Sequence, residues 1–310
     1  MKVLVTGGVG FIGSHLVDAL VSVGHSVVVV DHHQREKRRY PNEQATVYKM
    51  DFNDERMVSV LAEEKPDVIC HLAAQISVTK SIADPLHDAG RNIVDSLELL
   101  ERARVAGVKK MVFASSGGAI YGDHPLQPTP LVENCCPATP YGVSKQVFEY
   151  YLAAYYKTHG LPYVALRFAN IYGPRQQASK LGEEGNVISI FLNRLLTGQP
   201  AVIFGDGATT RDYLFVYDAV AALMAAIAGD FVGAVNVSTG IETSVQGVFD
   251  ELVVIHGQEH PLQYLPMRAG ETMRSVLDNS SARARLGWEP KTSFRDGLRL
   301  TYDWFMEVFR

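Results

Sequence analysis

Short apolar segments alternate with longer segments of helical periodicity through the first 170 residues. The apolar segments include KVLVTG, HSVVVVD, DVICHLAA and KKMVFASS, which are rich in β-branched residues and nearly continuous in hydrophobicity. Such runs are typical of strands that are covered by helices on both faces. The segments between them predict helices at 11–23, 54–64, 86–106 and 144–159. Strands that alternate with helices require crossover connections, so we expect an α/β fold with a Rossmann-type, doubly wound parallel sheet.

The pattern becomes less regular after residue 170. A long loop rich in Gly, Gln and charge, IYGPRQQASKLGEEG, precedes mixed helical and strand-like segments that end in an amphipathic helix at 294–309. We expect a Rossmann-type domain at 1–170, to which the chain returns at about 211–239. Residues 171–210 and 240–310 would form a smaller C-terminal domain for the substrate.

Composition and charge narrow the class of partner. The chain has 310 residues, 47% of them hydrophobic, and a net charge of −5, which argues against nucleic acid or an anionic membrane as the main partner. No apolar stretch approaches the ~20 residues that a membrane span needs. Three cysteines cannot form a disulfide framework, so we expect a cytoplasmic protein. Adjacent Cys135–Cys136 and His32–His33 lack the spacing of metal ligands, so no metal site is expected.

The motif TGGVGFIGS follows the first predicted strand and opens the first predicted helix. Gly7 permits a tight turn, Gly10 lets the backbone approach a pyrophosphate, and Gly13 lets the helix pack close to its strand. Phe11 and Ile12 begin the helix, whose N–H groups and positive dipole end would face the phosphates. The motif predicts a dinucleotide site.

Asp31 ends the second predicted strand. A carboxylate at this position accepts hydrogen bonds from the adenosine ribose hydroxyls and repels a 2′-phosphate, which favours NAD over NADP. Arg35 follows closely and offers the alternative, because an arginine there can bind a 2′-phosphate.

The segment PYGVSK places Tyr141 and Lys145 four residues apart, on one face of a helix. A tyrosine ionises near ~10, so action as a base near neutrality requires a pKa about 3 lower, equivalent to about 4 kcal/mol. We expect Lys145 and a positive nicotinamide ring to lower that pKa. A hydroxyl must also position the substrate oxygen. Ser116, at the end of the fifth strand, is the first candidate and Ser115 the second.

These motifs, together with HLAAQ, resemble the extended short-chain dehydrogenases/reductases. Within that family the chain is similar to the NDP-sugar 4-epimerases, the UDP-glucose 4-epimerases above all, through RFANIYGPRQ, FGDGATTRDYLFVYD and LGWEP. The resemblance implies that Ser116, Tyr141 and Lys145 are catalytic. It places Asp51 and Phe52 at the adenine, and Leu72, Ala73, Ala74 and Asn92 near the inner cofactor pocket.

The resemblance also implies a set of substrate residues. The nucleotide diphosphate would be bound by Asn170, Asn186, Val187, Arg211 and Arg268, with Glu271 close to the ribose. Arginine suits phosphate by its planar donor fork, although a surface ion pair is the alternative for each arginine. Ser275 matches the position that gates the 2-substituent of the sugar, and a side chain this small should admit an N-acetyl group.

The residues after Ser116 separate the possible reactions. Similar 4,6-dehydratases have an Asp-Glu pair there, whereas this chain has Gly117 and Gly118, and glycine cannot transfer a proton. We therefore expect an NAD-dependent UDP-sugar 4-epimerase, an isomerase that interconverts UDP-glucose and UDP-galactose, and also their N-acetylated forms, through a 4-keto intermediate. The alternatives are a UDP-glucuronate 4-epimerase, an unusual dehydratase and a non-catalytic NAD-binding regulator.

The resemblance also predicts a homodimer that pairs through two helices of each chain. The candidates are the helix at 86–106 and the helix that carries Tyr141, in which FEYYLAAYY provides apolar surface. The alternative is that these tyrosines pack inside the protein.

Overall fold

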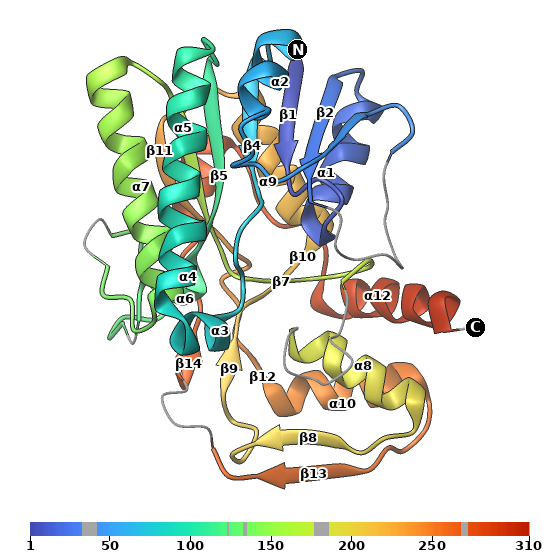
Figure 1. Ribbon diagram of the computed structural model, residues 1–310. Coiled ribbons are helices and arrows are strands. Elements are labelled where there is room, and N and C mark those ends of the chain that lie inside the picture. Colours follow the sequence, from blue (N-terminus) through green and yellow to red (C-terminus); the bar gives the residue numbers. More distant parts are fainter. Residues whose placement is uncertain (33–41, 123, 133–134, 177–185, 268–271, 310) are drawn as a thin grey trace.

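A seven-stranded sheet forms the centre of the computed structural model, which describes residues 1–32, 42–122, 124–132, 135–176, 186–267 and 272–309 (Figure 1). Its strands are β1 (Lys2–Thr6), β2 (Ser26–Asp31), β3 (Thr46–Lys49), β4 (Val68–His71), β5 (Lys110–Ser116), β6 (Tyr163–Phe168) and β11 (Gly233–Val237). Their order is β11-β6-β5-β4-β1-β2-β3, and all neighbours are parallel. The predicted doubly wound parallel sheet is confirmed. The chain order reverses between β1 and β4, the point where such sheets bind ligands.

Both faces of the sheet are buried, which explains the continuous apolar runs in the sequence. Val3 and Val5 belong to one hydrophobic core and Leu4 to another, because neighbouring residues of a strand point to opposite faces. The first core includes side chains of α1 (Phe11–Ser22) and α9 (Val216–Ala228). The second includes side chains of α2 (Met57–Glu64), α5 (Asp95–Val105) and α7 (Pro140–His159). Figure 1 shows α5 and α7 along one side of the sheet.

Two predicted helices differ from the structure in ways that matter for the site. The helix expected at 144–159 begins earlier, at Pro140, because Thr139 caps it by accepting a hydrogen bond from the N–H of Gly142 at 3.3 Å. Tyr141 therefore lies in the first turn of α7. The region expected to be one helix at 86–106 consists of α4 (Pro85–Ala89), a π-helical turn η1 (Gly90–Val94) and α5. Helix α3 (Val78–Ala83) was not predicted.

The chain after β6 forms smaller sheets below the central one (Figure 1). Strand β7 (Asn170–Tyr172) pairs with β10 (Tyr213–Phe215), and β8 (Ala201–Phe204) pairs with β13 (Leu262–Leu265). A third sheet contains β12 (Thr243–Ser244), β9 (Thr210–Arg211) and β14 (Arg274–Ser275). The remaining helices are α6 (Gly117–Ile120), α8 (Val187–Thr197), α10 (Val245–His256), α11 (Ser280–Leu286) and α12 (Phe294–Phe309).

Between these small sheets the chain returns to the central sheet. Helix α9 follows β10 directly and packs against α1, and β11 then joins the edge of the sheet beside β6. Within the described ranges, no helix combines the length and the hydrophobicity needed to cross a membrane.

Candidate active site

The glycine loop between β1 and α1 has the shape of a phosphate cradle. Gly7 has a φ of +72°, which favours glycine. A Cβ on Gly13 would lie 2.1 Å from the carbonyl oxygen of Gly7, so only glycine lets the helix approach the strand this closely. Gly10 caps α1 without a side-chain hydrogen bond, so no capping side chain occupies the N–H groups of the first turn, at Phe11 and Ile12. These features fit the pyrophosphate of a dinucleotide.

Asp31 lies beside this loop. Its Oδ2 accepts a hydrogen bond of 3.1 Å from the N–H of Val9, which fixes the carboxylate at the end of β2. This is the position from which a carboxylate reaches the adenosine ribose. Arg35, the basis of the NADP alternative, lies outside the described residues.

The two residues predicted at the adenine follow β3. The Asp51 carboxylate accepts hydrogen bonds of 2.8 and 2.9 Å from Arg91 in η1. The same guanidinium lies 4.8 Å from the ring centroid of Phe52. Phe52 itself is buried and packs edge-on against His71. Arg91 therefore fixes both residues, and the sequence analysis did not single it out.

The residues after β4 meet the glycine loop at the point where the strand order reverses. A Cβ on Gly7 would lie 2.9 Å from the backbone nitrogen of Ala73, so the two loops are in contact. Leu72 and Ala74 flank that contact along the chain. Gln75 is the next residue along the chain, and the side chain of Asn92 holds its backbone. The Asn92 amide accepts a 2.9 Å hydrogen bond from the Gln75 N–H and donates one of 2.9 Å to the Gln75 carbonyl. Asn92 therefore fixes the backbone of the loop after β4 at Gln75.

His71 is a second residue that the sequence analysis missed. Its ring nitrogens form hydrogen bonds with Thr6 at 2.8 Å and with Ser96 at 3.0 Å. Burial lowers the pKa of His71 to about 3, helped by the positive charges of Lys145 and Arg91. The imidazole is therefore neutral, and it links β1, β4 and α5 beneath the site.

Ser116, Tyr141 and Lys145 are brought together by the end of β5 and the first turns of α7. The Ser116 hydroxyl faces the Tyr141 phenol, and their interaction lowers the pKa of the phenol. The Lys145 Nζ lies 5.7 Å from the centroid of the Tyr141 ring and donates a 3.0 Å hydrogen bond to the carbonyl of Ala114. Ser115, the second candidate, points away from this group and donates to the buried Glu149. The geometry therefore favours Ser116.

The ionisation of this group differs from the sequence-based expectation. Burial raises the pKa of Tyr141 to about 12; the interaction with Ser116 opposes this, and the charge of Asp88 adds to it. Burial lowers the pKa of Lys145 to about 8, against the opposing effects of Asp88 and Glu149. The chain's own groups therefore keep the phenol protonated at neutral pH. A further positive charge is needed to ionise it, and the oxidised nicotinamide ring carries one.

The two glycines after Ser116 have different surroundings. A Cβ on Gly117 would lie 2.3 Å from the Leu277 side chain, so this position has no room for a side chain. A Cβ on Gly118 would lie 3.8 Å from Asn170 Oδ1 and 4.0 Å from Ser275 Oγ, at ordinary contact distance. Gly118 thus faces two of the predicted substrate residues.

The other predicted substrate residues reach the same region from separate parts of the chain. Ser275 pairs with Arg211 across β14 and β9. The N–H of Asn170 donates a 3.0 Å hydrogen bond to the carbonyl of Asp212, the residue after Arg211. Asn186 caps α8 and donates to the carbonyl of Ile171 at 3.1 Å, which brings Val187 near β7. Arg268 and Glu271 lie outside the described residues.

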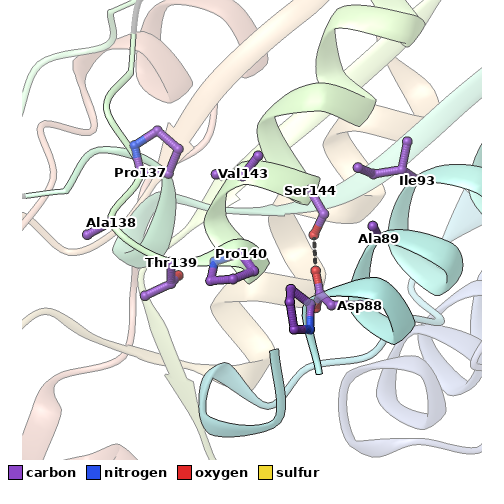
Figure 2. Close-up of a pocket in the computed structure, with 10 residues that line it drawn as sticks. Asp88, Ala89, Ile93, Pro137, Ala138, Thr139, Pro140, Val143 and Ser144 are labelled. Carbon is purple, nitrogen blue, oxygen red and sulfur yellow. Dashed lines mark hydrogen bonds between the residues drawn. The ribbon is translucent and has the colours of Figure 1, made fainter. Parts of the chain in front are cut away.

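A groove of about 440 Å³ lies on the other side of the first turn of α7. Figure 2 shows its lining, which is mostly proline and aliphatic side chains and includes Asp88 and Ser144. Ser116, Tyr141 and Lys145 do not line it, so this groove is not the sugar site. Asp88 is the third residue missed from the sequence, because acidic residues on short helices are usually exposed.

Comparison with known proteins identifies the family of the chain. Residues 3–237 match the family model of the NAD dependent epimerase/dehydratase family. The chain belongs to this family. The predictions of NAD as cofactor and of an NAD-dependent, isomerase-type enzyme are thereby confirmed.

The protein resembles several epimerases over nearly its whole length. A UDP-glucose 4-epimerase from Mycolicibacterium smegmatis is 42% identical over 312 aligned positions, which cover 98% of each chain. A UDP-glucose 4-epimerase from Thermotoga maritima, solved with UDP-glucose, is 42% identical with a TM-score of 0.96 and full coverage of both chains. A UDP-N-acetylglucosamine 4-epimerase from Methanobrevibacter ruminantium, solved with UDP-N-acetylmuramic acid, is 34% identical with a TM-score of 0.93, covering 99% and 98% of the two chains.

Proposed function

We propose that this protein is a UDP-sugar 4-epimerase that interconverts UDP-glucose and UDP-galactose, and also their N-acetylated forms. The observation that carries the proposal is the grouping of Ser116, Tyr141 and Lys145 beside the glycine loop. In the chain, Ser116 is followed by two residues without side chains. Oxidation of the sugar at C4 needs only Ser116, Tyr141 and Lys145 from the chain. Dehydration needs an additional acid and base, which Gly117 and Gly118 cannot supply.

In the proposed reaction, Tyr141 Oη removes the proton from the 4-hydroxyl of the sugar. Ser116 Oγ hydrogen-bonds to the reacting oxygen and keeps it beside the phenol. The Lys145 ammonium supplies positive charge near the ionised phenol. NAD, when bound beside these residues, would supply the redox chemistry, as a hydride acceptor in its oxidised form and a hydride donor in its reduced form. The 4-keto sugar then rotates so that its opposite face lies toward the nicotinamide. Tyr141 returns the proton to the 4-oxygen, and the product has the inverted configuration at C4.

The nucleotide part of the substrate must stay bound while the sugar turns. We assign this task to Asn170, Asn186 and Arg211, which approach one another in the small sheets, and to Arg268 and Glu271 on the resemblance alone. The space faced by Gly118 and Ser275 would then take the sugar, because small residues there leave it free to rotate.

The function is tested by incubating the purified protein with a panel of UDP-hexoses and separating the products. We expect epimers of unchanged mass, formed without added NAD because the cofactor is regenerated in each turnover. A product lighter by one water would instead identify a dehydratase. Exclusive conversion of UDP-glucuronate would identify the uronate epimerase.

Replacement of Ser275 by Tyr tests the substrate range. The new ring would fill the space beside Gly118, so we expect UDP-N-acetylglucosamine conversion to fall by about 10²-fold while UDP-glucose is still turned over. Kinetics on both substrates measure this. Ser280→Tyr, a change at an exposed serine of the same segment, is the control and should convert both. Equal conversion of both substrates by Ser275→Tyr would remove the gating role from Ser275.

A homodimer through α5 and α7 remains part of the proposal. These helices pack side by side on one flank of the protein. Val94 and Tyr150 are 61% and 53% exposed, so the alternative that the tyrosines of α7 all pack inside is wrong. Val94 lies at the end of η1, directly before α5, and Tyr150 lies on α7. Exposed apolar side chains on neighbouring elements are typical of an interface.

We expect the protein to elute as a dimer in size-exclusion chromatography. Val94→Arg should shift it to the monomer, because an interface centre does not tolerate an unpaired charge. Val254→Arg on α10, which changes a valine of similar 60% exposure, should remain dimeric. Elution of the unmodified protein at the monomer mass would contradict the proposal.

A further inference from the structure

Asp88 is a buried carboxylate on a helix whose neighbouring residues are exposed. Only 1% of its surface is accessible, whereas Asp84 and His87, which precede it in the chain, are exposed. Its side chain points toward α7, as Figure 2 shows for its hydrogen bond with Ser144. Burial of an acidic side chain costs free energy, so its surroundings must compensate for it.

Three uncharged groups provide the compensation. Ser144 Oγ donates to Asp88 Oδ2 at 2.7 Å. Gln75 Nε2 and Asn92 Nδ2 donate to Oδ1 at 2.8 and 3.0 Å. Hydrogen bonds to a charged group are stronger than neutral ones, which allows the carboxylate to remain buried.

These hydrogen bonds connect the loop after β4 with the first turn of α7. Gln75 belongs to the loop after β4, which touches the glycine loop through Ala73. Ser144 precedes Lys145, and the carbonyl of Tyr141, 3.0 Å from Ser144 Oγ, is a second acceptor that shares the single proton of this hydroxyl. Asp88 is therefore the link between the loop that shapes the cofactor pocket and the turn that carries the proton-transfer residues.

The charge of Asp88 has a second consequence. Lys145 is buried and faces four titratable groups: Tyr141 and Glu149 on α7, Asp88 on α4 and His71 on β4. Glu149 is already paired with Arg167, at N–O distances of 2.7 to 3.2 Å, and His71 is neutral. The negative charge that remains to balance the Lys145 ammonium is that of Asp88.

We propose that Asp88 is a positioning residue for the reaction: it fixes the first turn of α7 against the loop after β4, and it provides the negative charge that balances Lys145 next to Tyr141. This inference rests on the proposed function, in which Tyr141 is the base. Asp88 does not touch the substrate in this account and acts through Ser144, Tyr141 and Lys145.

The two roles have separable consequences for the pH profile. The negative charge of Asp88 raises the pKa of both Tyr141 and Lys145. Its removal lowers both pKa values, so the phenolate forms at lower pH and the ammonium is also lost at lower pH. The acidic and basic limbs of kcat should therefore move together toward lower pH. A loosened fold would reduce kcat without moving the limbs.

The experiment compares three variants of the NAD-loaded protein. Asp88→Asn keeps the network, because its Oδ1 can accept from Gln75 and Asn92 and its Nδ2 can donate to Ser144 Oγ, but it removes the charge. Ser144→Ala removes the hydrogen bond between α7 and Asp88 and keeps the negative charge of Asp88. Asp84→Asn removes an exposed charge from the cap of α4 and is the matched control.

For Asp88→Asn we expect both limbs of the kcat profile to shift down by about one pH unit, with NAD content and substrate KM unchanged. For Ser144→Ala we expect kcat to fall about tenfold with unshifted limbs, because the Asp88–Ser144 hydrogen bond positions Tyr141. Asp84→Asn should match the unmodified protein in kcat and in pH profile.

If the limbs of the kcat pH profile do not shift in Asp88→Asn, Asp88 does not balance the charge of Lys145. If Ser144→Ala has the kcat of the unmodified protein, the Asp88–Ser144 hydrogen bond does not position Tyr141. If Asp88→Asn does not fold, Ser144→Ala alone decides, and full kcat in it rejects the proposal. Either failure leaves the proposed function intact as long as Tyr141→Phe is inactive.

Discussion

Tyr141→Phe is expected to lower epimerisation by about 10³-fold or more, because the phenolic oxygen is the atom that we assign to proton transfer. The ring lies in the first turn of α7 beside Ser116 and Lys145, and phenylalanine retains its shape. The variant should therefore fold and keep its NAD. The measurements are turnover of UDP-glucose and the NAD released from denatured protein.

Tyr155→Phe is the matched control for this change. Tyr155 lies on the same helix, and its hydroxyl donates to Glu101 at 3.0 Å, away from the site. We expect its turnover to stay within about twofold of the unmodified protein, since surface substitutions have small effects. Substantial turnover by Tyr141→Phe would assign the base to another residue and would reject the proposed mechanism.

Gly13→Ala is expected to abolish NAD binding and to destabilise the fold. The added Cβ would lie 2.1 Å from the Gly7 carbonyl oxygen and 2.8 Å from the Gly8 Cα. These are backbone atoms that cannot rotate away, so α1 must move from β1 and the loop between them must change shape. Such overpacking costs about 1–3 kcal/mol. Bound NAD per chain and the thermal unfolding midpoint measure the two effects.

Gly90→Ala provides the comparison, because its added Cβ has no atom within 4 Å and its backbone is helical. We expect normal NAD content and an unfolding midpoint that is unchanged or slightly raised. A Gly13→Ala protein with full NAD content would show that close packing of α1 on the glycine loop is not required for the cofactor.

Some site residues were identifiable from sequence because local chemistry defines them. The glycine spacing reflects the backbone needs of a turn and a close approach, which the φ of Gly7 and the contacts of Gly13 illustrate. The spacing of Tyr141 and Lys145 places both on one helix face, although the start of that helix was predicted four residues late. The cap by Thr139 explains the earlier start, and it is a local signal that the analysis did not use.

Other residues were named as candidates from the sequence, but their arrangement in space depends on segments distant in the chain. The choice of Ser116 over Ser115 follows from which serine faces Tyr141 and which faces Glu149. The meeting of Asn170, Arg211 and Ser275 depends on the pairing of β9 with β14 and on the contact of β7 with the adjoining strand.

The sequence by itself determined the parallel sheet, and it located the glycine loop and the side chains to which we assign the chemistry, since hydrophobic period, glycine and residue spacing act over a few residues. Only the tertiary structure decided the burial of Asp88 and His71 and the direction in which the pKa of Tyr141 moves. Desolvation arises when remote segments close over a group and remove water from it. A pattern along the chain carries no information about that closure.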